Sequence, residues 1–306
     1  MLFSCFSINA LAGCGATFCS INTDWDSQGV WSESGGRFDF RYEWSNQNQL
    51  RSGSNTVSPK GIVGATDEIK TRNHNIVATW DYNLTPSWGF SVSLPFVRRD
   101  HSHIFNDAAG PTTEQWNFSR LGDMRVLGRY HLPPLGRGGH AGAIFGIKLP
   151  TGQINISNDA GQLAERSLQP GSGTTDLLLG GYYRNTSAAA NTSWFTQLLL
   201  QTPFNERDHF KAGNKFNLDA GYLRQVAKNI GLMLQLNYTV KQSDSGSNAE
   251  PEESGSRVLS ISPGVGYLWG RDSQIYGFVQ KPLYQHVNGT QLTSDWSLAL
   301  GVTTKF

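Results

Sequence analysis

The 306-residue sequence lacks any stretch of 18 or more consecutive apolar residues. A transmembrane helix needs about 20 such residues, so the length of the apolar runs excludes one. The chain also lacks a charge imbalance, because 25 lysines and arginines oppose 24 aspartates and glutamates, and no basic tract occurs. Nucleic acid is therefore not an expected partner. Helix caps followed by apolar residues at helical spacing are also scarce, which argues against a helical fold.

Cysteine is scarce too, with three in the chain, all within the first 19 residues. Residues 1–12 form an apolar run that ends in a small-x-small pattern typical of a signal-peptidase site. The first basic residue is Arg37, so we expect a signal-peptide remnant over 1–12 with the true translation start upstream. Two interpretations of the next cysteine stay open. Cys14 either pairs with Cys19 in a disulfide or, because Leu11–Cys14 fits a lipobox, carries a lipid.

The pattern that dominates the sequence is alternation of apolar and polar residues, which is the period of a β-strand. Residues 230–242 show it most regularly, with Ile, Leu, Tyr and Val opposite Gly, Met, Gln, Asn, Thr and Lys. The last such segment ends on Phe306, as in proteins recognised by the outer-membrane assembly machinery. Twelve segments are predicted as strands: 37–47, 73–84, 88–98, 122–132, 140–149, 174–184, 193–202, 215–225, 230–242, 257–269, 274–286 and 295–306.

Connections between these segments sort by length. Every second one is short, as at 85–87, 227–229 and 270–273. The others are longer and are predicted as loops: 48–72, 99–121, 150–173, 203–214, 243–256 and 287–294. A soluble β-sandwich has no reason to sort its loops in this way, whereas an outer-membrane barrel has short periplasmic turns and long external loops. We therefore predict an all-β fold, a single antiparallel up-and-down transmembrane β-barrel of about twelve strands over 37–306, in the bacterial outer membrane.

Residues 13–36 precede the first predicted strand and are mostly polar or small. They form either a periplasmic tail or a plug inside the barrel. Trp25 and Trp31 favour docking in the lumen or at its mouth, because tryptophan is a poor residue for a disordered tail.

Charged residues of both signs face the lumen if the apolar faces contact lipid. They form either a pore lining or a salt-bridge network that supports a narrow barrel. Mixed charge argues against steep ion selectivity. The candidate lumen residues are Arg37, Asp39, Arg41, Glu43, Asp81, Asp123, Arg125, Arg129, Lys148, Asp176, Arg184, Asp219 and Lys241.

The segment Asp100-His101-Ser102-His103 is the most enzyme-like cluster in the chain. Strand alternation places Ser102 on one side and both histidines on the other, so an activated serine is not expected and we predict no enzyme. His101 and His103 point the same way and could share a metal ion, although polar loop decoration is the simpler interpretation. Glycine pairs such as Gly180-Gly181 are not followed by helices, so no phosphate cradle and no cofactor is expected.

Three motifs carry a family resemblance. They are Leu121-Gly-Asp-Met-Arg-Val-Leu-Gly-Arg-Tyr130, Gly146-Ile-Lys-Leu-Pro-Thr-Gly152 and Gly171-Ser-Gly-Thr-Thr-Asp-Leu-Leu-Leu-Gly180. Together they resemble a family of outer-membrane proteins named for transport in the meta pathway of phenol degradation. The resemblance is close over the third to sixth predicted strands, and it implies uptake of aromatic compounds without identifying a binding residue.

The expected function is an outer-membrane channel or transporter for small molecules, hydrophobic or aromatic ones among them. Its expected partners are outer-membrane lipid, the assembly machinery during biogenesis and a small-molecule solute. The alternative is a non-transporting structural barrel that serves as a sleeve or docking site for a periplasmic protein, or as a surface adhesin.

Overall fold

The computed structural model describes residues 21–24, 28 and 34–306. All the regular elements in this part of the chain are β-strands. They are β1 (Gly35–Gly53), β2 (Asn55–Thr56), β3 (Thr66–Asn83), β4 (Trp88–Asp107), β5 (Gly110–Leu121), β6 (Met124–His131), β7 (Gly139–Leu149), β8 (Asp176–Ser187), β9 (Thr192–Pro203), β10 (Lys215–Ala227), β11 (Ile230–Lys241), β12 (Ser256–Trp269) and β13 (Ser273–Lys305). No helix in the described segments is long and apolar enough to cross a membrane.

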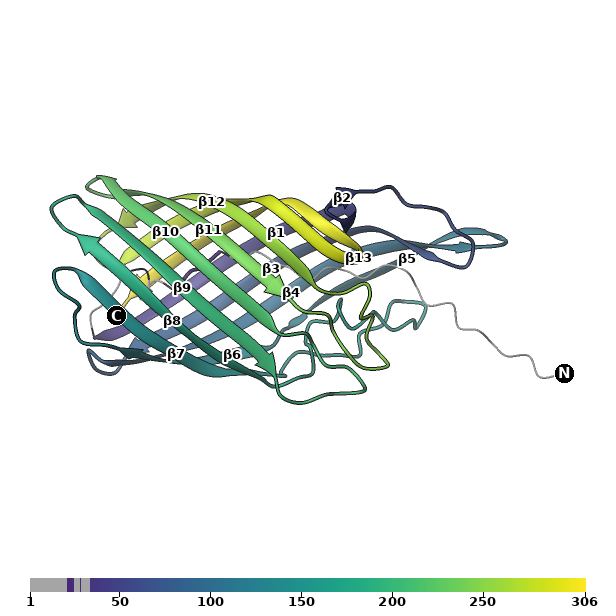
Figure 1. Cartoon of the computed structure of the whole chain (residues 1–306), viewed down its shortest axis with the longest axis horizontal. Coiled ribbons are helices and arrows are strands. Elements are labelled where there is room, and N and C mark those ends of the chain that lie inside the picture. The colour runs from purple at the N-terminus through teal and green to yellow at the C-terminus, as the bar shows by residue number, and fades with distance from the viewer. Residues whose placement is uncertain (1–20, 25–27, 29–33) are drawn as a thin grey trace.

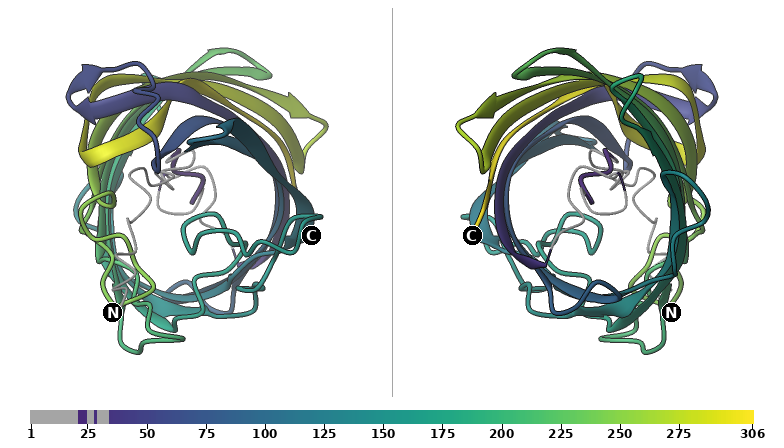
Figure 2. Two further views of the ribbon diagram at one scale, coloured as in Figure 1. Left: turned by 90° about the vertical axis from the view of Figure 1, so that its right-hand side faces the viewer. Right: turned by 90° about the vertical axis from the view of Figure 1, so that its left-hand side faces the viewer.

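The strands form one antiparallel sheet that closes on itself (Figures 1 and 2). The first part of β13 pairs with β12, and its last part pairs with β1 in a register that places Arg37 opposite Lys305. Two backbone hydrogen bonds of 3.0 Å between Gly36 and Phe306 complete the seam. Closure satisfies the backbone groups of every strand within the sheet, as a bilayer requires.

In two places the number of strands differs from the number of times the chain spans the barrel wall. The outer half of β4 pairs with β5 and its inner half with β6, so β5 and β6 are two parts of one span, interrupted at Gly122 and Asp123. The long β13 contributes two spans, because Lys305 donates a backbone hydrogen bond back to Asp272 at 2.8 Å. With β2 as a two-residue addition at the rim, the described chain has twelve spans, which confirms the predicted barrel.

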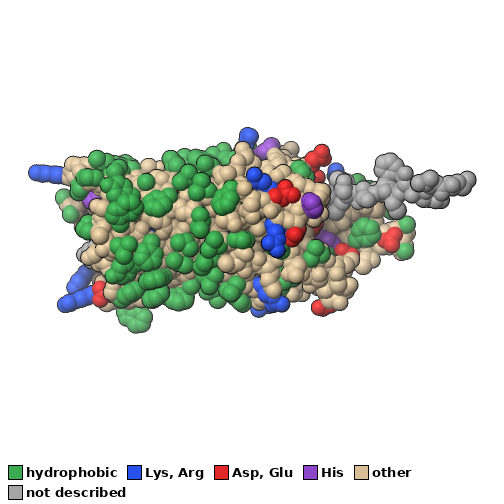
Figure 3. Space-filling view, turned by 90° about the horizontal axis from the view of Figure 1, so that it is seen from below, with side chains coloured by type: hydrophobic (Ala, Val, Ile, Leu, Met, Phe, Trp, Pro, Cys, Tyr) green, Lys and Arg blue, Asp and Glu red, His purple; other side chains and the backbone are tan. Residues whose placement is uncertain are grey.

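Side chains alternate between lipid and lumen as the sequence predicted. On β11, Leu232 and Leu234 are 50% and 44% exposed, whereas Met233 and Gln235, which alternate with them on the other face, are buried. Figure 3 shows the outward hydrophobic side chains as a broad belt, with charged side chains gathered mainly at the two ends. So much exposed apolar surface suits lipid and not water. The protein is a bacterial outer-membrane barrel whose belt contacts lipid.

Short turns lie at the end where Phe306 meets β1, and longer connections lie at the other end (Figure 1). Three predicted loops were wrong in part. Strands β1 and β3 extend into 48–72, β4 and β5 pair through most of 99–121, and β13 continues through 287–294. The outward positions of these extensions are mostly polar, whereas some inward ones, such as Leu50, Trp116 and Leu292, are apolar. The pattern of a lipid-facing strand therefore disappears from the sequence although the backbone ladder continues. The β4–β5 hairpin consequently projects beyond the barrel.

Candidate channel lumen

The interior of the barrel holds a cavity of about 470 Å³. Its wall includes side chains from β1, β3, β4, β6, β7, β9, β10 and β11, so it occupies the lumen and not the lipid-facing surface. Residues 21–24 and the loop that joins β7 to β8 also line it. Figure 2 shows both segments, purple and teal respectively, inside the outline of the barrel.

Asn22 attaches the amino-terminal segment to one side of the wall. Its backbone N–H donates to Gln235 Oε1 at 3.1 Å, and its side-chain amide donates to Asp219 Oδ2 at 3.2 Å. Gln235 returns a hydrogen bond of 3.0 Å to the Asn22 carbonyl oxygen. Ile21 packs in a buried cluster that includes Met233 and Phe278. Residues of β10, β11 and β13 thus hold this segment through both polar and apolar contacts.

Asp24 attaches the same segment to a distant part of the sheet. Its carboxylate accepts a hydrogen bond of 2.8 Å from Arg129 on β6, and Thr23 accepts one from Arg41 on β1. Arg129 also pairs with Asp81 at 2.8 Å, and Asp81 in turn binds Arg37. Residues 21–24 therefore cross the lumen and contact strands on both of its sides.

The predicted lumen residues separate into two groups. Nine line the cavity: Arg41, Glu43, Asp81, Asp123, Arg125, Arg129, Lys148, Asp219 and Lys241. Four are buried outside its lining: Arg37, Asp39, Asp176 and Arg184. Of these, Asp39 accepts hydrogen bonds of 3.0 and 2.9 Å from the Tyr276 hydroxyl. Part of the set therefore lines the cavity and part forms ion pairs such as Arg37–Asp81.

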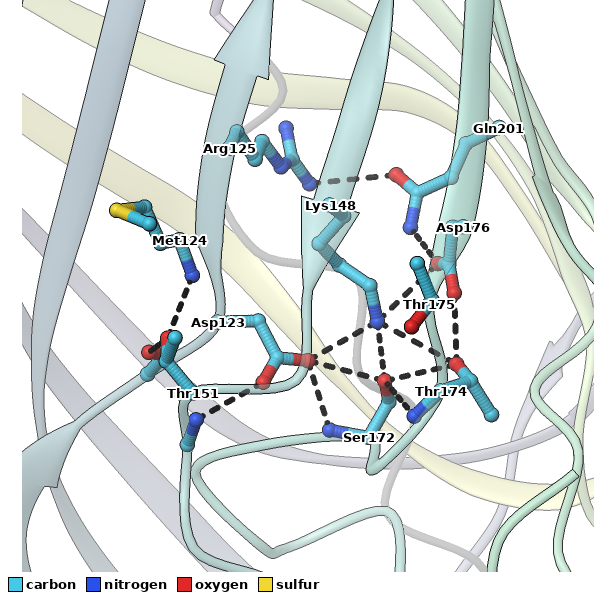
Figure 4. Close-up of polar contacts among 12 residues, drawn as sticks. Asp123, Met124, Arg125, Lys148, Thr151, Ser172, Thr174, Thr175, Asp176 and Gln201 are labelled. Carbon is cyan, nitrogen blue, oxygen red and sulfur yellow. Dashed lines mark hydrogen bonds and ion pairs between the residues drawn. The ribbon is translucent and has the colours of Figure 1, made fainter. Parts of the chain in front are cut away.

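Asp123 fastens both ends of the β7–β8 loop to the wall (Figure 4). Its carboxylate accepts backbone hydrogen bonds from Gly152 at 3.1 Å and from Ser172 at 2.9 Å. The Lys148 ammonium pairs with Asp123 at 3.0 Å and with Asp176 at 3.2 Å. These residues belong to the three family-like motifs, so the motifs meet in one anchor for the loop.

Close backbone contact explains two of the motif glycines. A Cβ on Gly171 would lie 2.5 Å from the Gly152 carbonyl oxygen, and one on Gly152 would lie 2.6 Å from the Gly171 Cα. Any larger residue at either position would push the two ends of the loop apart. Glycine at these two positions allows the two backbone segments to approach closely.

The middle of the β7–β8 loop is held by the outer half of the β4–β5 hairpin, farther toward the long-loop end than Asp123. Arg99 on β4 donates to the backbone carbonyl oxygens of Ser167 at 3.2 Å and Leu168 at 2.5 Å. Leu168 and Ala164 join a buried cluster with Trp116 and two further apolar side chains. The β7–β8 loop is therefore part of the lumen wall and narrows the lumen.

Positive charge exceeds negative charge around the cavity, with eight lysines and arginines and six aspartates and glutamates in the lining. The excess of positive charge lies mainly in the part of the wall that contains Arg125 and Lys215. Arg125 hydrogen-bonds Gln201 at 3.3 Å, and neither it nor Lys215 forms an ion pair with a described carboxylate. Lys215 lies within Coulombic range of Arg125 and Lys241 and also of Asp219 and Glu43. In this part of the wall, cations that form no ion pair among the described residues lie beside carboxylates and give the cavity its small excess of positive charge.

The structure brings His101 and His103, the two histidines that could share a metal ion, together with a third group. His101 and His103 lie side by side on β4, and Glu68 on β3 is paired with His103 in the ladder. One ligand atom from each of the three lies within 4.8 Å of those of the other two. Nearby, in the β11–β12 loop, burial and the charge of Glu68 raise the pKa of Glu250 to about 7.

Several residues of the lumen escaped the sequence analysis. Asn22, Gln235 and Lys215 gave no signal, because amides and single lysines occur throughout such strands. Glu68 lay in a predicted loop, and Arg166 lay in another. Extending the alternation of β3 outward would still have misplaced Glu68, because the register shifts between Glu68 and Lys70. The cysteine pair predicted at 14 and 19 lies outside the described residues.

Solved structures share this architecture. The COG4313 outer membrane channel from Pseudomonas putida F1 superposes with a TM-score of 0.67 at 14% identity, covering 90% of this chain and 96% of that one. The KdgM porin superposes with a TM-score of 0.47 at 10% identity, covering 88% of this chain and 99% of the porin. The β domain of the Bordetella autotransporter BrkA superposes with a TM-score of 0.49 at 12% identity, covering 90% of this chain and 100% of that domain. No curated protein sequence matches the chain. At such low identity the first of these likenesses supports the fold alone.

A protein-family model covers most of the barrel. The family is described as "Putative MetA-pathway of phenol degradation", and its model matches residues 45–298. That range contains all three motifs that form the loop anchor. The chain belongs to this family.

Proposed function

We propose that the protein is an outer-membrane channel through which small solutes diffuse. The observation that supports this best is the lumen itself, which holds a cavity of about 470 Å³ lined by polar and charged side chains. A barrel that served only as a rigid support would gain more by filling that space with packed side chains. Residues 21–24 and the β7–β8 loop restrict the passage, so the channel is narrower than its twelve spans alone would make it.

We further propose small aromatic solutes as the cargo, with anionic ones favoured. The family description points to aromatic compounds, and apolar lining residues such as Val97, Ile144 and Phe210 offer surface for a ring. The positive charge of Arg125 and Lys215 attracts carboxylates and sulfonates into the same space. No step of this function requires catalysis.

A swelling assay on liposomes containing the folded protein tests the proposal. Benzenesulfonate and trimethylphenylammonium are similar in size, carry permanent opposite charges and cross a bare bilayer poorly. We expect faster swelling with benzenesulfonate than with trimethylphenylammonium, and slow swelling with a large oligosaccharide. Equal swelling rates with the two aromatic ions would contradict the proposed preference for anions. Absence of swelling with every solute would contradict the proposed channel function.

A sleeve for a periplasmic protein is less favoured. The described residues 21–24 and 28 of the chain itself occupy the lumen, and Ser193 hydrogen-bonds the Gln28 carbonyl oxygen at 3.1 Å. A threaded partner would have to displace these contacts.

A further inference from the structure

Glu68, His101 and His103 lie outside the apolar belt, at the end of the barrel that carries the long loops. Beyond Phe96 the outward positions of β4 become charged, beginning with Arg98. The three side chains point to the other face of the sheet and are 1%, 2% and 7% exposed. Burial of a carboxylate beside two imidazoles is costly unless their charges and lone pairs are compensated.

A β-bulge creates the cluster. The register of β3 against β4 shifts between Glu68 and Lys70, so Glu68 and Thr71 face the same side although they are three residues apart. On the partner strand, His101 and His103 share that side because they are two residues apart. Bulges commonly redirect a side chain toward a functional site, and this one directs Glu68 between the two histidines.

The ligand atoms of the three side chains lie close enough together to surround a metal ion, all within 4.8 Å of one another. Glu68 Oε2 lies 3.5 Å from His101 Nε2, and Glu68 Oε1 lies 3.7 Å from His103 Nδ1. Both distances exceed the normal range of a hydrogen bond. Ligands bound at about 2.0–2.1 Å to a tetrahedral zinc ion lie about 3.3 Å from one another. The three ligand atoms, which lie within 4.8 Å of one another, would move closer together to bind such an ion.

The other nitrogen of each ring is held by an outer partner. His101 Nδ1 lies 2.9 Å from the Thr71 hydroxyl, and His103 Nε2 lies 2.7 Å from Glu114 Oε2. Histidines that ligate metals typically donate their second N–H in this way. When Nδ1–H of His101 donates to Thr71 and Nε2–H of His103 donates to Glu114, the two lone pairs point at the Glu68 carboxylate.

The surroundings also favour a bound cation. Glu250 lies within Coulombic range of Glu68 and His103, which adds negative potential. Trp116 packs against the rings of His103 and His101, with centroid distances of 4.7 and 5.7 Å, and shields them from water. The side chain of Glu114 remains 21% exposed, which leaves a route for a metal ion to enter.

We propose that Glu68, His101 and His103 bind a divalent transition-metal ion, of which Zn²⁺ fits the donor set best. Two imidazole nitrogens and one carboxylate supply three ligands, and water completes the tetrahedron. Glu114 links the site to the β7–β8 loop, because it accepts a hydrogen bond from Gln162. The ion joins the projecting β4–β5 hairpin to β3 and stiffens the support of the loop that narrows the lumen.

Zinc titration of the chelator-treated, folded protein tests the site, with a chromogenic chelator as competitor. We expect one Zn²⁺ per chain in the wild type, and visible absorption typical of tetrahedral coordination when Co²⁺ replaces it. His101→Gln, His103→Gln and Glu68→Gln should each weaken binding more than the roughly 100-fold that changes in outer partners reach. Glu114→Gln should weaken it about 10- to 100-fold.

His286→Gln is the matched control. This histidine is outside the cluster and lies 3.1 Å from the Ser54 hydroxyl. Its replacement should leave zinc affinity unchanged. Heat-modifiable migration in electrophoresis reports whether each variant is folded, so loss of binding by an unfolded variant is not scored. Absence of stoichiometric binding in the folded wild type would overturn the proposal, as would equal affinity in the folded ligand variants and the control.

Discussion

Removal of the Asp123 carboxylate should release the β7–β8 loop from the lumen wall. In Asp123→Ala, the backbone N–H groups of Gly152 and Ser172 lose their acceptor, and Lys148 loses one of its two carboxylates. A hydrogen bond to a charged group contributes about 1.5–3 kcal/mol, and water in the lumen replaces part of each one, so we expect a net loss of about 2–4 kcal/mol. That loss raises the population with a released loop about 30-fold to several hundred-fold.

Limited trypsin digestion and single-channel recording measure this release. The loop contains Arg166, which donates to the Ser172 carbonyl oxygen at 3.0 Å and stacks on Phe210 while the loop is anchored. Cleavage after Arg166 should accelerate in Asp123→Ala, because proteolysis follows the open population when closing is fast. Conductance should rise as well. Asp159→Ala, an exposed position in the same loop, is the control. Wild-type cleavage and conductance in Asp123→Ala would refute the anchoring role.

Three further substitutions test the lumen and the belt. Phe278→Ala, in the cluster that holds Ile21, should lower the unfolding free energy in urea by about 3–5 kcal/mol, and a change within error would contradict that packing. Leu234→Arg, on the lipid face, should reduce the folding free energy into bilayers by about 2–4 kcal/mol, and a neutral result would place this position outside the membrane. Arg125→Glu should make the channel more cation-selective, which a shift of the reversal potential in a salt gradient would show. Arg98→Glu, on the outer face, should leave the reversal potential unchanged, and equal shifts in the two variants would exclude an effect of charge in the lumen.

The sequence predicted the membrane-facing part of the barrel well because lipid imposes a strict rule on it. Every outward position of β11 must be apolar, so its boundaries could be read directly. Beyond the hydrophobic belt, the outward positions face water and need not be apolar. Backbone pairing that begins at Phe96 opposite Leu121 holds the β4–β5 hairpin together. Its outward positions, such as Arg98 and Asn117, are polar, so the sequence lacks the apolar outward face by which a lipid-facing strand is recognised.

The interior was harder to predict because its contacts join residues far apart in the chain. Asn22 meets Gln235 across 213 positions, and neither residue is unusual in its own neighbourhood. The family-like motifs were visible, yet only the fold shows that Asp123, Gly152 and Ser172 form one anchor. Glu68 required the bulge on β3 as well, because simple alternation places it on the wrong face.

Single-channel recording of the folded wild-type protein in planar bilayers tests the central claim most directly. A lumen lined by charged side chains should give discrete, ohmic current steps that are smaller than those of an unobstructed twelve-stranded barrel. Variants that detach the amino-terminal segment, such as Asp24→Ala combined with Asn22→Ala, should enlarge these steps. Insertion of heat-modifiable, folded protein without any current, in both the wild type and the double variant, would contradict a channel.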